Sequence, residues 1–171
     1  MLYSMAHIDN MTNVNNRRSF DEYMDSAKEN TPDEQLVFFS FDLNDLKDAN
    51  DSYGHEAGVV LIIGAADCMR EVLSPFGSVY RTGGDEFAVV ALIEPEKRAG
   101  IIQKLTDRFA LWRGKLYPSP LSISVGYVCA DENPNLSLED MRREAEKRMY
   151  AKKADHYMEE GNDRRRARKY N

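Results

Sequence analysis

The chain has 171 residues, of which 42% are hydrophobic and 30% charged, a composition typical of one soluble globular domain. A chain of this length buries roughly 70% of its unfolded surface, so its core needs neither disulfides nor a structural metal. The net charge of −6 argues against general nucleic-acid binding. Cys68 and Cys129 lack zinc-site spacing, which favours packed thiols in a reducing compartment and a cytoplasmic location.

Both ends of the chain bear on localisation. No apolar run approaches the ~20 residues of a membrane-spanning helix, and the N-terminus lacks the pattern of an export signal. We therefore expect no membrane segment within this chain and no export. The basic segment 161–171 could touch a phosphate or a membrane surface, but a disordered, solvated tail is favoured. This predicts a domain over 1–160 and a disordered tail over 161–171.

The predicted elements begin with a helix over 16–30. The run 35–42 is almost wholly apolar, typical of a central strand covered on both faces, and it ends at Asp42. A short helix or turn is expected over 42–53, followed by Gly54 and a longer helix over 55–73. Two strands, 79–82 and 86–92, flank Gly83 and Gly84, which are expected to supply positive φ angles for a hairpin. A helix over 95–114, a strand over 121–129 and a helix over 137–158 follow.

Strands separated by helices, with one hairpin, predict an α/β sandwich on a mixed sheet of four or five strands. On the helix over 55–73, one apolar face that includes Ala57, Leu61 and Cys68 is expected to pack on the sheet. The opposite face is predicted to carry an apolar patch made by Val59, Ile62, Ile63 and Ala66.

Two carboxylates stand at the ends of predicted elements. Asp42 closes the buried strand, and Asp85 lies at the tip of the hairpin. If these strands are neighbours, the two acids converge on a hard-oxygen site for one or two Mg²⁺ ions, as in phosphoryl transfer. Acids at loop ends are also common without a catalytic role, so spacing alone leaves both interpretations open.

The polar segment after Asp42 favours a phosphate site. Backbone N–H groups at the start of a short helix, with Lys47 behind them, can hold a triphosphate. The P-loop and dinucleotide-binding motifs are absent from the sequence. A calcium-binding EF-hand loop is excluded, because it requires glycine and glutamate where the chain has Lys47 and Tyr53.

Residues 83–87 read Gly-Gly-Asp-Glu-Phe, and Arg81 precedes them. This run is the signature of the GGDEF domain family of diguanylate cyclases, which the sequence resembles. Four further blocks are similar to family motifs in the same order and together span nearly the whole chain: 9–18, 42–55, 124–126 and 145–150.

The resemblance implies a palm-like, nucleotidyl cyclase-like α/β fold with a mixed, mostly antiparallel sheet flanked by helices. It implies that two GTP molecules, one on each domain of a transient homodimer, condense to the bacterial second messenger cyclic di-GMP with release of pyrophosphate. The implied cofactor is Mg²⁺ or Mn²⁺. We also expect a sensor domain before Met1 in a longer regulatory protein.

The family likeness assigns roles to individual residues. Asp42 and Asp85, with the carbonyl of Leu43, would hold the metal ion, and Glu86 would assist metal binding or deprotonate the attacking hydroxyl. Lys47 and the backbone N–H groups of Asp45 and Leu46 would bind phosphates, and Asn50 would contact guanine. The expected substrate-binding set also includes Gly83, Gly84, Arg81 and Lys153. Arg81 is as well suited to pairing with an acid of the fold as to facing a phosphate.

Three positions depart from the family pattern. Val59 stands where the family has an aspartate that reads guanine, and Tyr157 replaces a phosphate-binding arginine. Residues 74–77 lack the arginine and aspartate of the family's inhibitory product site. The first interpretation is an active diguanylate cyclase. The alternatives are a module that binds nucleotide or a partner protein without turnover, and a cyclase with relaxed base choice that makes mixed cyclic dinucleotides.

Overall fold

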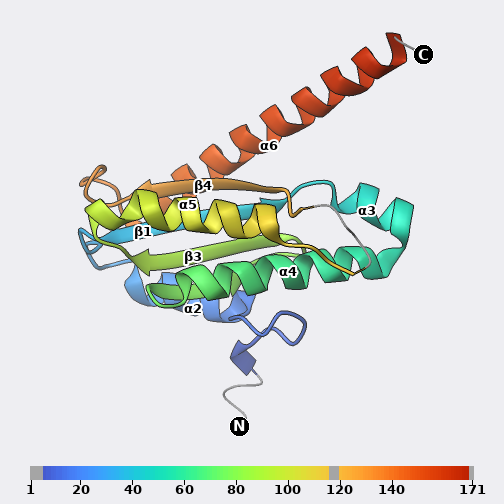
Figure 1. Cartoon of the computed structure of the whole chain (residues 1–171). Coiled ribbons are helices and arrows are strands. Elements are labelled where there is room, and N and C mark those ends of the chain that lie inside the picture. The colour runs from blue at the N-terminus through green and yellow to red at the C-terminus, as the bar shows by residue number, and fades with distance from the viewer. Residues whose placement is uncertain (1–5, 116–119, 170–171) are drawn as a thin grey trace.

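A four-stranded sheet in the order β2-β3-β1-β4 forms the centre of the domain (Figure 1). The structure is a computed structural model that describes residues 6–115 and 120–169. The expected order of elements is confirmed: α2 (Arg17–Ala27), β1 (Leu36–Leu43), α3 (Leu46–Tyr53), α4 (His55–Leu73), β2 (Gly77–Arg81), β3 (Glu86–Leu92), α5 (Pro95–Leu111), β4 (Ile123–Cys129) and α6 (Leu138–Lys169).

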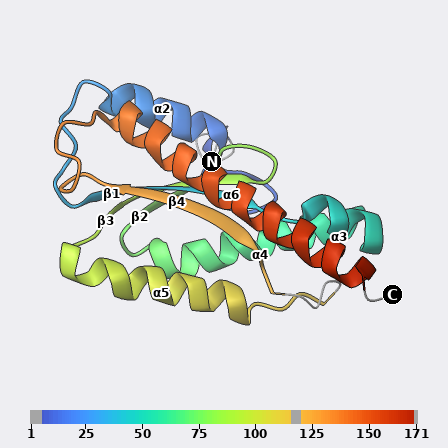
Figure 2. The same ribbon diagram turned by 90° about the horizontal axis from the view of Figure 1, so that it is seen from above.

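Strand β1 lies in the interior of this sheet, and all eight of its residues are buried. Helices α4 and α5 cover one face of the sheet, and α2 and α6 cover the other (Figure 2). Because side chains alternate along a strand, Phe39 and Phe41 enter the core beneath α4 and α5, whereas Phe38 packs with Phe20 on the α2 and α6 side. Two cores share one strand, which explains its continuous apolar run.

The predicted palm-like α/β architecture is confirmed, with one refinement of the sheet. Strand β1 pairs antiparallel with both β3 and β4, and β2 pairs antiparallel with β3. The parallel contact recorded among the described residues is an isolated bridge between Asn15 and Tyr80. The expected mixed character is therefore wrong for the four strands, because every neighbouring pair in the sheet is antiparallel.

The hairpin between β2 and β3 closes without the left-handed backbone that was expected of its glycines. Among the described glycines, Gly54 has a positive φ, of 90°, where it ends α3 and precedes α4. The turn is closed by other contacts: the N–H groups of Thr82 and Gly83 donate to the carbonyl of Glu86 at 2.9 and 3.3 Å. The predicted conformational role of Gly83 and Gly84 is therefore wrong.

The apolar patch predicted on α4 is largely interior. Ile62 and Ala66 are 7% and 0% exposed and belong to the core beneath α4 and α5. Val59 and Ile63 keep partial exposure. More than half of the residues of α4 are buried, because α3 and α5 also pack against this helix.

Helix α6 continues to Lys169, beyond its predicted end at Met158, and its C-terminal half projects away from the sheet (Figure 1). The predicted end of this helix at Met158 is therefore wrong. The segment contains no proline and is rich in arginine, a good helix former, so the helix has little reason to stop. Among the described helices, none combines the length and apolar character required to span a bilayer.

Gly126 allows α6 to lie directly on β4. A Cβ at this position would lie 2.1 Å from the carbonyl oxygen of Ala145 and 2.4 Å from the backbone nitrogen of Met149. Both atoms belong to the helix backbone, so they cannot move aside as a flexible side chain could. The close approach of α6 to the sheet therefore depends on the missing side chain.

We predict that Gly126→Ala lowers the free energy of unfolding by roughly 1–3 kcal/mol, because overpacking forces α6 away from β4. Gly100→Ala is the matched control, since a Cβ on this exposed α5 residue meets no atom within 4 Å. The control should stabilise the domain by about 0.5–1 kcal/mol through helix propensity. Urea unfolding at 25 °C measures both, and equal effects of the two variants would contradict this account.

Candidate functional site

The structure brings the two predicted carboxylate-bearing segments together at one end of the sheet. Asp42 is the cross-strand partner of Glu86, and the N–H of Leu43 donates to the carbonyl of Asp85 at 3.1 Å. The side chain of Asp42 is 7% exposed. The convergence follows from the antiparallel pairing of β1 with β3, which sets the end of one strand beside the start of the other.

A lysine from α6 lies against these groups. The Nζ atom of Lys153 is 2.9 Å from Oδ1 of Asp42, and it donates a hydrogen bond to the carbonyl oxygen of Leu43 at 3.0 Å. Lys153 was predicted to contact phosphate, whereas here its ammonium contacts the two groups predicted to bind metal. The ammonium thus marks a position where two oxygens of the chain hold a cation.

The pKa of Asp42 reflects this environment. Burial is the main cause that raises it to about 6, and the negative charges of Asp85 and Glu86 act in the same direction. Lys153 opposes the shift through its hydrogen bond and its charge. The positive charge of Lys153 therefore does not fully offset the burial of Asp42 and the two negative charges near it.

These observations test whether the site suits a divalent cation. Mg²⁺ and Mn²⁺ prefer oxygen ligands, and the cradle consists of carboxylate and carbonyl oxygens. A univalent ammonium already occupies the position, and a doubly charged ion would relieve the raised pKa of Asp42 more fully. The residues present fit the expected metal.

The segment between β1 and α3 is shaped by an unusual backbone conformation. Asp45 has a φ of 61°, in the left-handed region, and precedes the first residue of α3. The buried Asn44 fixes the segment to its neighbours by donating to Oγ of Ser122 at 3.1 Å and accepting from Ser124 at 2.9 Å. Lys47 is exposed at the N-terminal turn of α3, on the segment predicted to bind phosphate.

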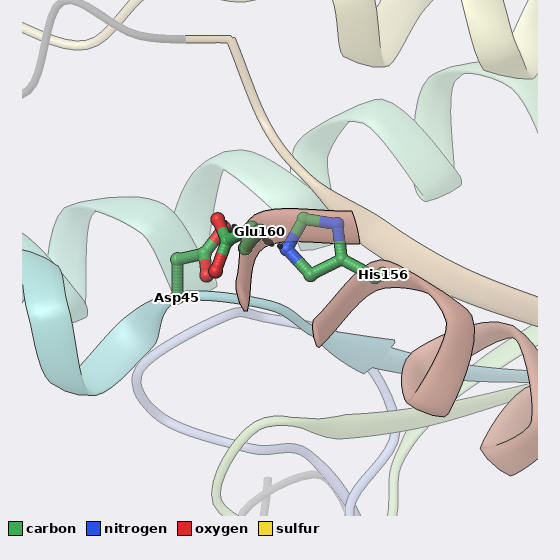
Figure 3. Close-up of side chains that lie close together, drawn as sticks. All are labelled: Asp45, His156 and Glu160. Carbon is green, nitrogen blue, oxygen red and sulfur yellow. Dashed lines mark hydrogen bonds and ion pairs between the residues drawn. The ribbon is translucent and has the colours of Figure 1, made fainter. Parts of the chain in front are cut away.

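Helix α6 contacts this segment with two further side chains. The N–H of Asp45, predicted to donate to phosphate, instead donates to the hydroxyl of Tyr157 at 3.4 Å. The side chain of Asp45 lies 2.9 Å from Nε2 of His156, one helical position before Tyr157 (Figure 3). Tyr157 is therefore hydrogen-bonded to a backbone N–H that was predicted to bind phosphate.

A cleft of about 430 Å³ opens beside Asp85. Its apolar wall is made by Met11, Leu46, Val59 and Ile62. Its polar lining comes from Asn50, His55, Gly58, Arg81, Gly84 and Asp85. The cleft combines an apolar surface for a planar ring with few polar groups, which is typical of a small-molecule site.

Asn50 is oriented within this cleft by α4. Its Oδ1 accepts from the N–H of Gly58 at 2.9 Å, and a Cβ on Gly58 would lie 2.3 Å from that oxygen. The bond uses the amide oxygen, so the NH₂ group is the part of the Asn50 side chain that can donate to a ligand. Asn50 can therefore serve an acceptor atom of a nucleobase.

The two interpretations of Arg81 can be compared with its contacts. Its guanidinium lies 3.2 Å from both carboxylate oxygens of Asp9 and donates to the carbonyl of Gly84 at 2.8 Å. Asp9 in turn accepts from the N–H and the hydroxyl of Thr12, and these bonds help to lower its pKa. Arg81 thus pairs with an acid of the fold and holds the signature turn in place.

Glu86 lies at the same end of the sheet but points toward α6. The hydroxyl of Tyr150 donates to Oε1 of Glu86 at 3.3 Å. Burial is the first cause that raises the pKa of Tyr150, and the charge of Glu86 is the second. Glu86 is partly exposed and lies opposite Asp42 in the sheet.

A model of the GGDEF domain, described as a diguanylate cyclase domain, matches residues 6–159. The chain belongs to the GGDEF domain family. It is 31% identical over 162 residues to the signaling protein YkoW of Bacillus subtilis, covering 89% of this chain and 20% of that protein. It is 27% identical over 154 residues to the probable diguanylate cyclase DgcI of Escherichia coli, covering 89% and 32%. The chain spans less than half of the length of these relatives.

Solved GGDEF domains share the fold. The GGDEF domain of TpbB (YfiN) from Pseudomonas aeruginosa is 26% identical, with a TM-score of 0.74 over 87% of this chain and 90% of that chain. The GGDEF domain of DgcB from Caulobacter crescentus, solved in complex with c-di-GMP, has a TM-score of 0.72 at 23% identity, covering 88% and 91%. The second likeness supports the fold alone.

Sequence reasoning missed two residues that contact the site. Tyr157 was noted as the loss of an arginine, and His156 was given no role. A detectable signal existed for His156, because His156 and Glu160 are four positions apart and share one face of a helix. The partner of that pair, Asp45, comes from a distant segment and could be found only from the structure.

The raised pKa of Asp42 predicts a pH dependence of stability. In the unfolded chain the pKa of an aspartate is about 3.9, whereas that of folded Asp42 is about 6, so the folded state binds the proton more tightly. The stabilisation is complete below the unfolded value and is lost as pH rises through the folded value. Asp42→Asn has no carboxylate to titrate at this position and does not suffer this loss. Its free energy of unfolding relative to that of wild type should therefore rise by roughly 1–3 kcal/mol from pH 4 to pH 7.5.

Urea unfolding in EDTA at both pH values measures this gain. The control Asp155→Asn changes an exposed acid two positions after Lys153 and should show a difference from wild type that does not change with pH. If the stability difference between Asp42→Asn and wild type is also the same at both pH values, the pKa of Asp42 is not raised.

Proposed function

We propose that this GGDEF domain acts as a diguanylate cyclase that condenses two GTP molecules to cyclic di-GMP and releases pyrophosphate. Each copy binds one GTP, and two copies face each other in a transient homodimer. The observation that carries the proposal is the cation cradle of Asp42 and the Leu43 carbonyl, which holds the ammonium of Lys153 beside Asp85. Hard oxygens gathered at this edge suit a nucleotide that arrives with Mg²⁺ or Mn²⁺.

In this proposal Asp42, Asp85 and the carbonyl of Leu43 hold the ion. The chemistry that the bound ion supplies is a lower pKa for the attacking 3′-hydroxyl and neutralisation of charge on the phosphoryl group. Lys153 leaves Asp42 when the nucleotide binds, and its long side chain turns to the phosphates. Glu86 lies close enough to Asp42 to influence its pKa, so it is suited to accept the hydroxyl proton.

The phosphates are assigned to the start of α3. Lys47 is exposed there, and the N–H groups of Asp45 and Leu46 lie at the positive end of the helix. Gly83 and Gly84 add backbone without side chains, and a Cβ on Gly84 would meet no atom within 4 Å. A phosphate can approach this backbone closely.

The base is assigned to the cleft beside Asp85. Val59 offers no hydrogen-bond acceptor to the donors of guanine, while the NH₂ group of Asn50 can serve acceptors that guanine and adenine share. A cyclase with relaxed base choice, which makes mixed cyclic dinucleotides, is therefore a second form of the same proposal.

The second candidate function is a module that binds nucleotide or a partner protein without turnover. It is favoured by the hydroxyl of Tyr157, which accepts from the N–H of Asp45 at 3.4 Å and so competes with phosphate for that donor. One experiment separates the candidates: purified protein is incubated with Mg²⁺ and GTP, ATP or both, and the products are identified by mass spectrometry. Cyclic di-GMP supports the cyclase, mixed dinucleotides support relaxed base choice, and bound but unreacted nucleotide supports the module.

We predict that Asp42→Asn and Asp85→Asn each weaken Mg²⁺-dependent GTP binding at least tenfold, because a single carboxylate cannot hold the ion and the phosphates together. Both substitutions keep the size of the side chain, so the fold should persist. Calorimetric titration with a non-hydrolysable GTP analogue measures the affinity. Asp155→Asn is the exposed control and should bind like wild type; full binding by either site variant would remove the two-carboxylate site.

A separate prediction concerns base choice at Val59. An unpaired buried donor costs about 1–3 kcal/mol, so Val59→Asp should raise the preference for GTP over ATP roughly tenfold to a hundredfold. Val59→Ala is the control, since it reduces the side chain without adding an acceptor and should leave the preference unchanged. The two affinities are measured in parallel titrations. If Val59→Asp and Val59→Ala behave alike, guanine is read elsewhere in the cleft.

A further inference from the structure

Three side chains that can ligate a metal meet where α6 passes the start of α3 (Figure 3). Asp45 comes from the segment after β1, and His156 and Glu160 come from α6. One ligand atom from each lies within 4.8 Å of the other two. Among the side chains that the structure describes, in 6–115 and 120–161, no other group of three or more lies this close together. It involves neither Asp42 nor Asp85, the predicted magnesium ligands.

We propose that Asp45, His156 and Glu160 form a binding site for a divalent transition metal ion of the Zn²⁺ type. The Nε2 atom of His156 is 2.9 Å from Oδ2 of Asp45 and 3.4 Å from Oε1 of Glu160. Two atoms that each lie ~2.0–2.1 Å from a tetrahedral Zn²⁺ are about 3.3 Å apart. The two distances from His156 therefore lie within a few tenths of an ångström of the spacing that the ion requires.

Two features prepare these side chains for an ion. His156 and Glu160 are four positions apart on one helix, so the backbone of α6 holds them on the same face. The Oδ1 atom of Asp45 is buried and has no hydrogen-bond partner. A buried carboxylate oxygen without a partner costs free energy, and a bound ion or its water ligand would satisfy it.

The ligand chemistry separates this site from the proposed magnesium site. Imidazole nitrogen and carboxylate oxygen are both ligands that Zn²⁺ accepts, and a water molecule can complete the tetrahedron. The cradle at Asp42 offers oxygen alone, which suits Mg²⁺. One domain would thus carry two neighbouring cation sites of different preference.

Metal binding here would fasten α6 to the segment proposed to bind phosphate. Tyr157, next to His156, accepts from the N–H of Asp45, so an ion on the Asp45 side chain would keep this contact in place. We therefore expect bound Zn²⁺ to weaken GTP binding. This consequence rests on the proposed function, whereas the metal site itself does not.

Titration calorimetry with Zn²⁺ tests the site in the chelator-treated full chain. The titration is done in the Asp42→Asn background, so that the oxygen cradle cannot supply the signal. We expect one ion per chain with a dissociation constant in the micromolar range or tighter. His156→Ala and Glu160→Gln should each weaken binding at least tenfold. Glu159→Gln, an equal change of charge on the neighbouring exposed residue, should have no effect.

Substitution with Co²⁺ gives a second readout that does not depend on nucleotide. A Co²⁺ ion bound by nitrogen and oxygen in tetrahedral geometry absorbs visible light strongly, and this band should disappear in His156→Ala. The absence of Zn²⁺ binding would overturn the proposal, as would equal weakening by Glu159→Gln and Glu160→Gln. Absence of cyclic dinucleotide synthesis by wild-type protein that still binds Zn²⁺ would overturn the proposed function alone.

Discussion

A carboxylate buried at the end of a central strand costs free energy unless positive charge lies beside it. In this domain that carboxylate is Asp42, and the positive charge is the ammonium of Lys153 from α6, 2.9 Å away. The contact joins the last helix to the middle of the sheet at the functional end of the molecule. It also sets the condition for any ligand: a bound ion must replace the lysine, and the lysine must find a new partner such as a phosphate.

Helix α6 acts on the site through one face. Lys153, His156 and Tyr157 are separated by three and four positions, so they lie on the same side of the helix. All three contact the segment from the end of β1 to the start of α3, through Asp42, the carbonyl of Leu43 and both the backbone and the side chain of Asp45. The groups proposed to bind metal and phosphate are therefore covered by a single rigid element. The stability of the covered state and the affinity for nucleotide are linked, because both depend on the same donors and acceptors.

The sequence predicted those parts of the fold that local pattern controls. The apolar run of β1 identified a central strand, and its end at a polar residue placed Asp42 next to the signature turn. What local pattern cannot show is which distant side chain satisfies a buried group. For that reason the lysine at Asp42, the pairing of Arg81 with Asp9 and the meeting of Asp45 with His156 required the structure. The end of α6 was mispredicted because the basic composition of the last residues was given more weight than their helix propensity. The backbone of Gly83 was mispredicted because the preference of glycine for positive φ was given more weight than the hydrogen bonds to Glu86 that close the turn.

Charge balance connects Tyr157, the departure from the family pattern on α6, with the charged side chains around it. A triphosphate brings several negative charges, and the replacement of an arginine by Tyr157 removes one positive charge from its expected path. The carboxylates of Asp45 and Glu160 add negative charge to the same region, and of the two imidazole nitrogens of His156, Nε2 faces both of them. A divalent cation held by these three residues would reverse the sign of the local field, but it would also keep Tyr157 on the backbone donor that phosphate needs. These two effects on phosphate binding oppose each other. The N–H of Asp45 cannot bind phosphate while it donates to Tyr157, whereas the charge of the cation is partly screened by water at this partly exposed site. The loss of the donor therefore outweighs the gain in positive charge.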